Sequence, residues 1–334
     1  GCGDGIDLPG VNVETDLNKI PLPDNNVNLE QVELKPSTEP MLHEGLHTEE
    51  DFQRIRDKKA AGEEPWVSAY QLLVESQFSQ KTADTYPTEW IKRGVSGDEN
   101  YMNAARGATI AYQQALRWKI EQDDEYAAKA VENLNKWVQT CVGVTGNTNL
   151  SLAAGLYGYE FAIAGELLRD YEGWDRADFA AFQNWLLKVF YPANDDFLKR
   201  HHDTNALHYW ANWCLCNIAA KMAIGIVTDR RDIYNEGIGH LQTGDTNGRL
   251  RRAIYHDYAP DYNFAQWQES GRDQGHTLMC VGLMGVICQL AWSQGDDFFA
   301  YDDNLFMRAC EYAACCNYTN ETVPYTTYIW QKQS

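Results

Sequence analysis

The 334-residue sequence contains no uninterrupted apolar run of about 18 residues, so we expect no membrane-spanning helix. Basic residues are scarce: 28 Lys and Arg against 48 Asp and Glu give a net charge of −20. Such an acidic chain is unsuited to binding nucleic acid. The nine cysteines lack the spacing of a zinc ribbon. Nothing in the sequence therefore predicts a metal site or a cofactor.

Eight of the cysteines lie after residue 140, mostly in apolar surroundings such as LMCVGLMGVICQL. Cysteine in such surroundings behaves as a small hydrophobic residue. We predict buried free thiols, with a disulfide as the alternative in an exported protein.

The first 40 residues are acidic and contain five prolines, which break helices. We predict that residues 1–40 form a flexible linker. Gly1-Cys2-Gly3 resembles the mature end of a bacterial lipoprotein, whose cysteine is acylated. This predicts an exported monomer in the periplasm or at the outer membrane or cell surface, attached through Cys2. A cloning remnant beside a chance cysteine is the alternative.

Residues 41–334 are predicted to form one helical domain. Thr48 begins a capping box, and apolar residues then recur at helical spacing. The predicted helices cover 100–122, 125–141, 150–171, 176–191, 205–227, 232–242, 276–292 and 304–316. About ten to twelve helices joined by short loops imply antiparallel neighbours. No repeat of fixed period is present, which favours an all-α, α/α barrel (toroid) over a superhelical stack.

Six of the eight histidines lie between His201 and His276. On a helix, His202, Asn205, His208 and Asn212 would share one side. Arginines follow at 249, 251 and 252, so this part of an acidic chain can form a cationic pocket for an anionic ligand.

Several blocks of the sequence together carry a family resemblance over residues 41–325. They are TEEDFQRIRDKKAAGEEPW, NAARGATIAYQQALRWKI, NLSLAAGLYGYEFAIAGELLRDYEGW, NALHYWANWCLCNIAAKMAIGI, ESGRDQGHT and EYAACCNYTNETVPY. They resemble the alginate lyase superfamily, most closely polysaccharide lyase family 38, and RRAIYHDYA resembles family 5 alginate lyases. The resemblance implies an α/α toroid that degrades an anionic polysaccharide, a polyuronate such as mannuronate-rich alginate, by β-elimination.

The resemblance also implies catalytic roles. Tyr258 would transfer the proton, while Asn205, Arg252 and a histidine would neutralise the uronate carboxylate in the transition state. In family 5 an Asn-His pair directly precedes Tyr-Trp. Here two residues separate Asn205 from His208, so His202 and His208 both remain candidates. A neighbouring arginine is expected to lower the pKa of Tyr258.

Other polar and aromatic residues of the same stretch are predicted to bind substrate. They are Arg249, Arg272, His276, Trp210 and His256. Several of the candidate residues also have a structural interpretation. Asn205 could cap its helix, while His208 and the tryptophans could pack in the core. Arg272 and His276 could brace the cleft through Asp273.

Three other functions are considered. A lyase of glucuronan or another glucuronate polymer would use the same groups. A glycoside hydrolase would need two carboxylates, for which Asp203, Asp257, Glu269 and Asp273 are available. A glycan-binding lipoprotein would need aromatic platforms and no base.

Overall fold

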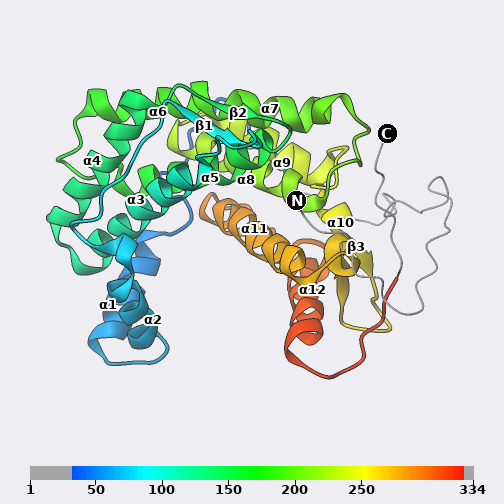
Figure 1. Ribbon diagram of the computed structural model, residues 1–334. Coiled ribbons are helices and arrows are strands. Elements are labelled where there is room, and N and C mark those ends of the chain that lie inside the picture. The colour runs from blue at the N-terminus through cyan, green and yellow to red at the C-terminus, as the bar shows by residue number, and fades with distance from the viewer. Residues whose placement is uncertain (1–31, 327–334) are drawn as a thin grey trace.

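The computed structural model describes residues 32–326 and is mostly helical (Figure 1). The helices and strands are α1 (Glu49–Ala60), α2 (Trp66–Glu75), η2 (Gln77–Ser79), β1 (Trp90–Arg93), α3 (Tyr101–Glu121), α4 (Asp124–Thr140), β2 (Gly143–Gly146), α5 (Leu150–Leu168), α6 (Arg176–Val189), α7 (Tyr191–Arg200), η3 (His201–Asp203), α8 (Ala211–Val227), α9 (Arg231–Thr243), α10 (Leu250–Ala253), β3 (Ile254–Asp257), β4 (Ala265–Trp267), η4 (Gln268–Gly271), α11 (Gln274–Ser293) and α12 (Tyr301–Tyr318).

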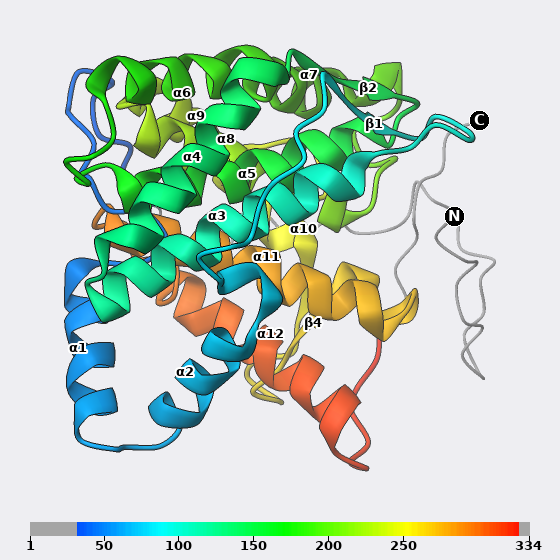
Figure 2. The ribbon, with the colours of Figure 1, turned by 60° about the vertical axis from the view of Figure 1, so that its left-hand side comes forward.

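Four helices, α3, α5, α8 and α11, pack side by side in sequence order. Helices α4, α9 and α12 pack against α3, α8 and α11 respectively, as a second layer (Figures 1 and 2). Within the first layer α5 and α8 run parallel. A Cβ on Gly155 would meet Cys216, and one on Gly158 would come within 3.4 Å of Ala220. The predicted all-α toroid architecture is confirmed.

The parallel helices of the first layer begin at the same end of the domain. Ser151, at the start of α5, contacts His202 shortly before α8. Trp210, directly before α8, lies under the guanidinium group of Arg272, two residues before the start of α11. The N-terminal ends of three long helices therefore meet, and each contributes a partial positive charge that favours an anion.

Most predicted helices are present within a few residues of their expected bounds, and the capping box at Thr48 is formed. The helix expected over 205–227 begins later than predicted, at Ala211. Helix α7, with a proline in its first turn, was not predicted. Two short strand pairs also form: β1 with β2 in parallel, and β3 with β4 antiparallel.

The segment 32–40, part of the predicted linker, contacts the helical domain. Lys35 donates to the Gln294 carbonyl at 3.2 Å, and Arg231 donates to the carbonyls of Glu39 and Pro40. Contacts with the helical domain therefore begin before residue 40, which was the predicted end of the linker. Cys2, the predicted lipidation site, lies outside the described residues.

All eight cysteines within residues 32–326 are free thiols. Five are buried, and Cys310, Cys315 and Cys316 are partly buried, so the predicted free thiols are confirmed. Helix α11 is long and apolar enough to cross a membrane by length and composition alone, a test that the core helix of a soluble protein also passes. It packs between α8 and α12, which is the environment of a core helix.

Candidate functional site

The chain enters α8 through a strained turn that carries His202. His201, His202 and Asp203 have φ values of 49°, 52° and 59°, a left-handed conformation that is unusual for residues other than glycine. Such strain concentrates at functional sites. The turn places the Nε2 of His202 2.8 Å from Ser151 Oγ. Burial lowers the pKa of His202, so its imidazole is neutral near pH 7.

The predicted helical face of four polar residues is not formed, because residues 201–210 are a turn and a loop. Only Asn212 lies on α8. Asn205 is exposed, and its side-chain oxygen accepts a hydrogen bond from the Leu207 amide at 2.9 Å. The His208 ring packs edge-on against Tyr209, with ring centroids 4.8 Å apart. Tyr209 also contacts the His202 ring at 5.7 Å, so both candidate histidines flank one aromatic side chain.

The start of α8 is capped by residues distant in sequence. Its own N-cap residue, Trp210, makes no side-chain cap hydrogen bond. Instead Gln268 Oε1 accepts from the Ala211 amide at 2.9 Å, and Glu269 Oε2 accepts from the Asn212 amide at 3.2 Å. Both acceptors belong to η4. They satisfy two amide groups that a helix start leaves without intrahelical partners.

Glu269 is fully buried and is the centre of a polar cluster. Besides the Asn212 amide groups, it accepts from Arg272 at 2.8 Å and from the thiol of Cys280 at 2.7 Å. The Arg272 guanidinium lies 4.7 Å from the centroid of the Trp210 ring. Arg272 is therefore buried as a brace for Trp210. This is the bracing alternative, chiefly through Glu269 at 2.8 Å, with Asp273 as a more distant partner at 4.0 Å.

His276, the other predicted binding residue of this motif, is part of the cap of α11. Asp273 accepts from the His276 amide at 2.7 Å and contacts its Nδ1 at 2.6 Å. The carboxylate thus fixes both the helix start and the ring orientation.

The three arginines around α10 differ in their contacts. Arg249 donates to the Gln242 carbonyl at 3.1 Å, and Arg252 donates to the Asp245 carbonyl. Arg251 instead pairs with Asp302 at 2.9 Å and, at 3.4 Å, with Asp257. Burial and the charge of Arg249 lower the pKa of Arg252. Arg249 and Arg252 therefore remain candidates for an anionic ligand, while Arg251 is neutralised by its acids.

Tyr258 follows β3 rather than lying on a helix. Its hydroxyl donates to Gln266 Oε1 at 2.7 Å and lies 2.8 Å from Thr326 Oγ1. The ring of His256 packs against it at 4.6 Å. Burial raises the pKa of Tyr258, so the expectation that an arginine lowers it is wrong. The nearest arginines in sequence are bound to backbone carbonyls or to aspartates instead.

Two later segments of the chain, one before α10 and the other at β4 and η4, reach the loop before α8 and the start of that helix. The side-chain amide of Asn247 donates to the carbonyls of Leu207 and Tyr209, at 3.1 and 2.8 Å. Gln266, the partner of Tyr258, lies two residues before Gln268, which caps α8. The loop that carries His202 and His208 and the strand pair that carries Tyr258 are thus both connected to the start of α8.

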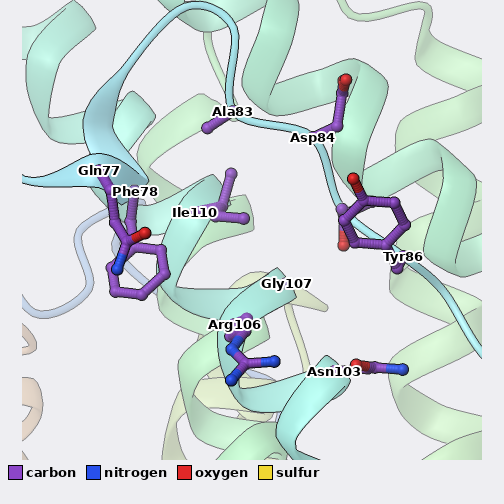
Figure 3. A pocket seen from close by; sticks show the side chains of 10 residues that line it. Gln77, Phe78, Ala83, Asp84, Tyr86, Asn103, Arg106, Gly107 and Ile110 are labelled. Atoms are coloured by element: carbon purple, nitrogen blue, oxygen red, sulfur yellow. The ribbon is translucent and has the colours of Figure 1, made fainter.

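Two arginines on the neighbouring α3 side were missed by the sequence interpretation. Arg93 lies over the ring of Tyr101, 4.5 Å from its centroid, and its guanidinium is 3.5 Å from the Tyr157 hydroxyl. Arg106 lines a pocket beside α3 (Figure 3). Their signal in the sequence was weak, because each is an isolated arginine outside the histidine-rich stretch.

Within residues 32–326 no group of three or more His, Cys, Asp or Glu side chains could hold a metal ion.

The sequence profile of the alginate lyase family matches residues 55–321. The chain belongs to the alginate lyase family. It is a polysaccharide lyase, and the expected membership of the alginate lyase superfamily is confirmed. The resemblance to polysaccharide lyase family 38 stays a prediction. A search of curated proteins finds no match.

Solved structures of alginate lyases share the fold. Alginate lyase A1-III of Sphingomonas species A1 is 14% identical, with a TM-score of 0.59 over 83% of this chain and 80% of that one. A variant of A1-III complexed with a tetrasaccharide gives a TM-score of 0.61 at 14% identity, over 81% and 78% of the two chains. An alginate lyase from Bacteroides ovatus gives 0.55 at 14% identity, over 80% and 81%.

Proposed function

We propose that this polysaccharide lyase cleaves alginate, with mannuronate-rich polymer preferred, by β-elimination at the start of α8. One observation carries the proposal: His202 and Tyr258, two groups able to transfer protons, are both tied to that helix end. His202 reaches it through Tyr209, and Tyr258 reaches it through the β4–η4 segment. The A1-III structure with a bound tetrasaccharide has the same fold.

The protonation states of His202 and Tyr258 favour one of them as the base and the other as the acid. Neutral His202 can accept the C5 proton of a uronate, since its lowered pKa keeps a lone pair available. Tyr258, held as a neutral phenol by its raised pKa, can donate its proton to the departing glycosidic oxygen. An unprotonated leaving oxygen would be an alkoxide, a stronger base than phenolate, so the proton passes to it and the sugar leaves as an alcohol, with Tyr258 left as phenolate and the C5 proton on His202. The C4–O bond breaks as the C4–C5 double bond forms.

Removal of the C5 proton adds electron density to the uronate carboxylate, which must be neutralised. Asn205 and Arg252 retain this proposed role, with Arg249 beside them. Trp210, held by Arg272, and His256, packed on Tyr258, are proposed to bind sugar rings nearby.

The carboxylates that a glycoside hydrolase would use are all engaged. Glu269 is buried among four donor groups, Asp257 pairs with Arg308, and Asp273 caps α11. Asp203 pairs with Arg200 at 2.8 Å. These contacts favour a lyase over a hydrolase.

The test is the formation of unsaturated uronate, followed by near-ultraviolet absorbance on a panel of polymannuronate, polyguluronate and glucuronan. Tyr258→Phe should reduce turnover by at least ~100-fold while oligouronate still binds. Tyr262→Phe is the matched control, because Tyr262 lies in the same hairpin and is 53% exposed. Wild-type protein that yields no unsaturated product from any polymer would refute the proposed function.

A further inference from the structure

A pocket of about 370 Å³ lies between α3 and the segment from η2 to residue 86. Asn103, Arg106 and Ile110 line it from α3 (Figure 3). Phe78 stands on one side and Tyr86 on the other. The volume is within the range of small-molecule sites, which are mostly apolar with a few placed polar groups.

The segment that covers α3 is held in place by buried contacts, so the pocket is preformed. Trp137 Nε1 donates to Thr85 Oγ1 at 2.5 Å, and the Thr85 amide donates to Asn133 at 3.3 Å. Gly107 permits this approach, because a Cβ there would lie 2.4 Å from Trp137 Nε1 and 2.7 Å from Thr85 Oγ1.

Arg106 is the charged group available to a ligand. It makes no hydrogen bond or ion pair with any other residue between 32 and 326. Nearby lysines are paired: Lys81 with Asp123 at 2.7 Å, and Lys129 with Asp84. In a chain with a net charge of −20, an arginine without an acidic partner is notable.

Asp84 is the one carboxylate that lines the pocket, and it is already neutralised. Its hydrogen bond to Lys129 lowers its pKa, and its carboxyl end points away from Arg106 (Figure 3). The charge left for a ligand is therefore the guanidinium of Arg106.

The groups that line the pocket fit one acidic sugar. A guanidinium group binds a carboxylate through two parallel hydrogen bonds. The side-chain amides of Gln77 and Asn103 can bind hydroxyl groups, and Phe78 and Tyr86 offer apolar faces to a sugar ring.

The pocket lies on the helix that begins beside the proposed catalytic region. Arg106 is five residues after Tyr101, about 7.5 Å along the helix axis. Tyr101 stacks with Arg93, which reaches Tyr157 on α5, the helix whose first turn contacts His202. A polysaccharide chain is long enough to contact both places.

We infer that this pocket is a second uronate-binding site, in which Arg106 holds a sugar of the polymer away from the bond that is cleaved. The inference rests on the proposed function. It predicts that long substrates gain affinity from the pocket and that the shortest cleavable oligouronate does not.

The test compares Arg106→Gln with Lys136→Gln, which removes the same charge from α4 outside the pocket. For Arg106→Gln we expect KM on polymer to rise about 10-fold, the scale of one charge-assisted hydrogen bond, with kcat unchanged. Its KM on the shortest cleavable oligomer should not change, and Lys136→Gln should resemble wild type. Equal KM values for Arg106→Gln and wild type on polymer, or equal losses on both substrates, would overturn the inference.

Calorimetry with a saturated oligouronate longer than the shortest cleavable oligomer separates this inference from the proposed function. Binding that weakens in Arg106→Gln but persists in Tyr258→Phe supports the pocket even if no polymer is cleaved. Binding that is unaffected by Arg106→Gln refutes the pocket even if the protein is an active lyase.

Discussion

Glu269 accepts hydrogen bonds from both amide groups of Asn212, at 3.2 Å from the backbone and 2.8 Å from the side chain. One buried carboxylate therefore caps α8. Through its ion pair with Arg272, it also fixes the guanidinium group that lies over the Trp210 ring. The ESGRDQGH motif holds the proposed site together, and its acidic members are not free to act on a substrate.

Replacement of Glu269 by glutamine should be strongly destabilising. The change leaves the buried Arg272 with only Asp273, at 4.0 Å, as a counter-ion, and it places the NH2 group of the new side chain against other donors. Loss of one partner of a buried pair costs about 3–5 kcal/mol. Asp123→Asn is the control: Asp123 caps α4 at a half-exposed position, where its only ion-pair partner among residues 32–326 is the surface Lys81, so its replacement should cost about 1 kcal/mol or less. Urea unfolding measures both, and similar small costs would contradict the capping role.

His202 and His208 should differ in their effect on turnover. His202→Gln should lower kcat by at least ~100-fold because the proposed base is lost, whereas His208→Gln should lower it far less. Burial lowers the pKa of His202, so the base stays unprotonated below the ordinary histidine pKa. Activity of the wild type should therefore fall only as pH drops below about 6.5. An equal loss in both variants would show that the base has been misassigned.

Arg252 and Arg251 provide a matched pair of neighbouring arginines. Arg252→Ala and Asn205→Ala should each lower kcat/KM by about 100-fold, the typical scale for a lost transition-state donor. Arg251→Ala should act on stability, because it leaves Asp302 without its ion-pair partner. Steady-state kinetics and thermal melting on the same preparations distinguish the two effects. Normal kinetics in both Arg252→Ala and Asn205→Ala would place the neutralising groups elsewhere.

His240 should make the protein sensitive to acid. Burial and the adjacent Lys221 lower its pKa to about 4 in the folded state. Between about pH 4 and 6.5 the unfolded chain binds a proton that the folded chain does not, so stability rises with pH across this window. The loss on acidification should amount to about 3 kcal/mol at most.

His240→Gln tests this contribution while it keeps an acceptor for the ammonium of Lys221, which lies 3.0 Å from His240 Nε2. Denaturant unfolding at pH 7 and pH 4.5 should show a smaller loss of stability in the variant than in the wild type. Parallel pH profiles for the two proteins would rule out His240 as a source of the acid sensitivity.

The sequence alone determined the helical architecture and the family. Apolar residues at helical spacing and the capping box at Thr48 are local signals, so they predicted α1, α3, α4 and α5 closely. The burial of most cysteines followed from their apolar neighbours. The family followed from several blocks spread over the chain.

The geometry of the site was decided only by the tertiary structure. Residues 201–210 were expected on a helix because their spacing suits one, but the caps that start α8 come from Gln268 and Glu269, nearly 60 residues later. A pKa likewise depends on burial, and this reversed the expectation for Tyr258. Spacing in the sequence reflects interactions between residues that are close along the chain. Helix capping, burial and ion pairing also depend on residues from distant parts of the chain, which only the folded structure brings together.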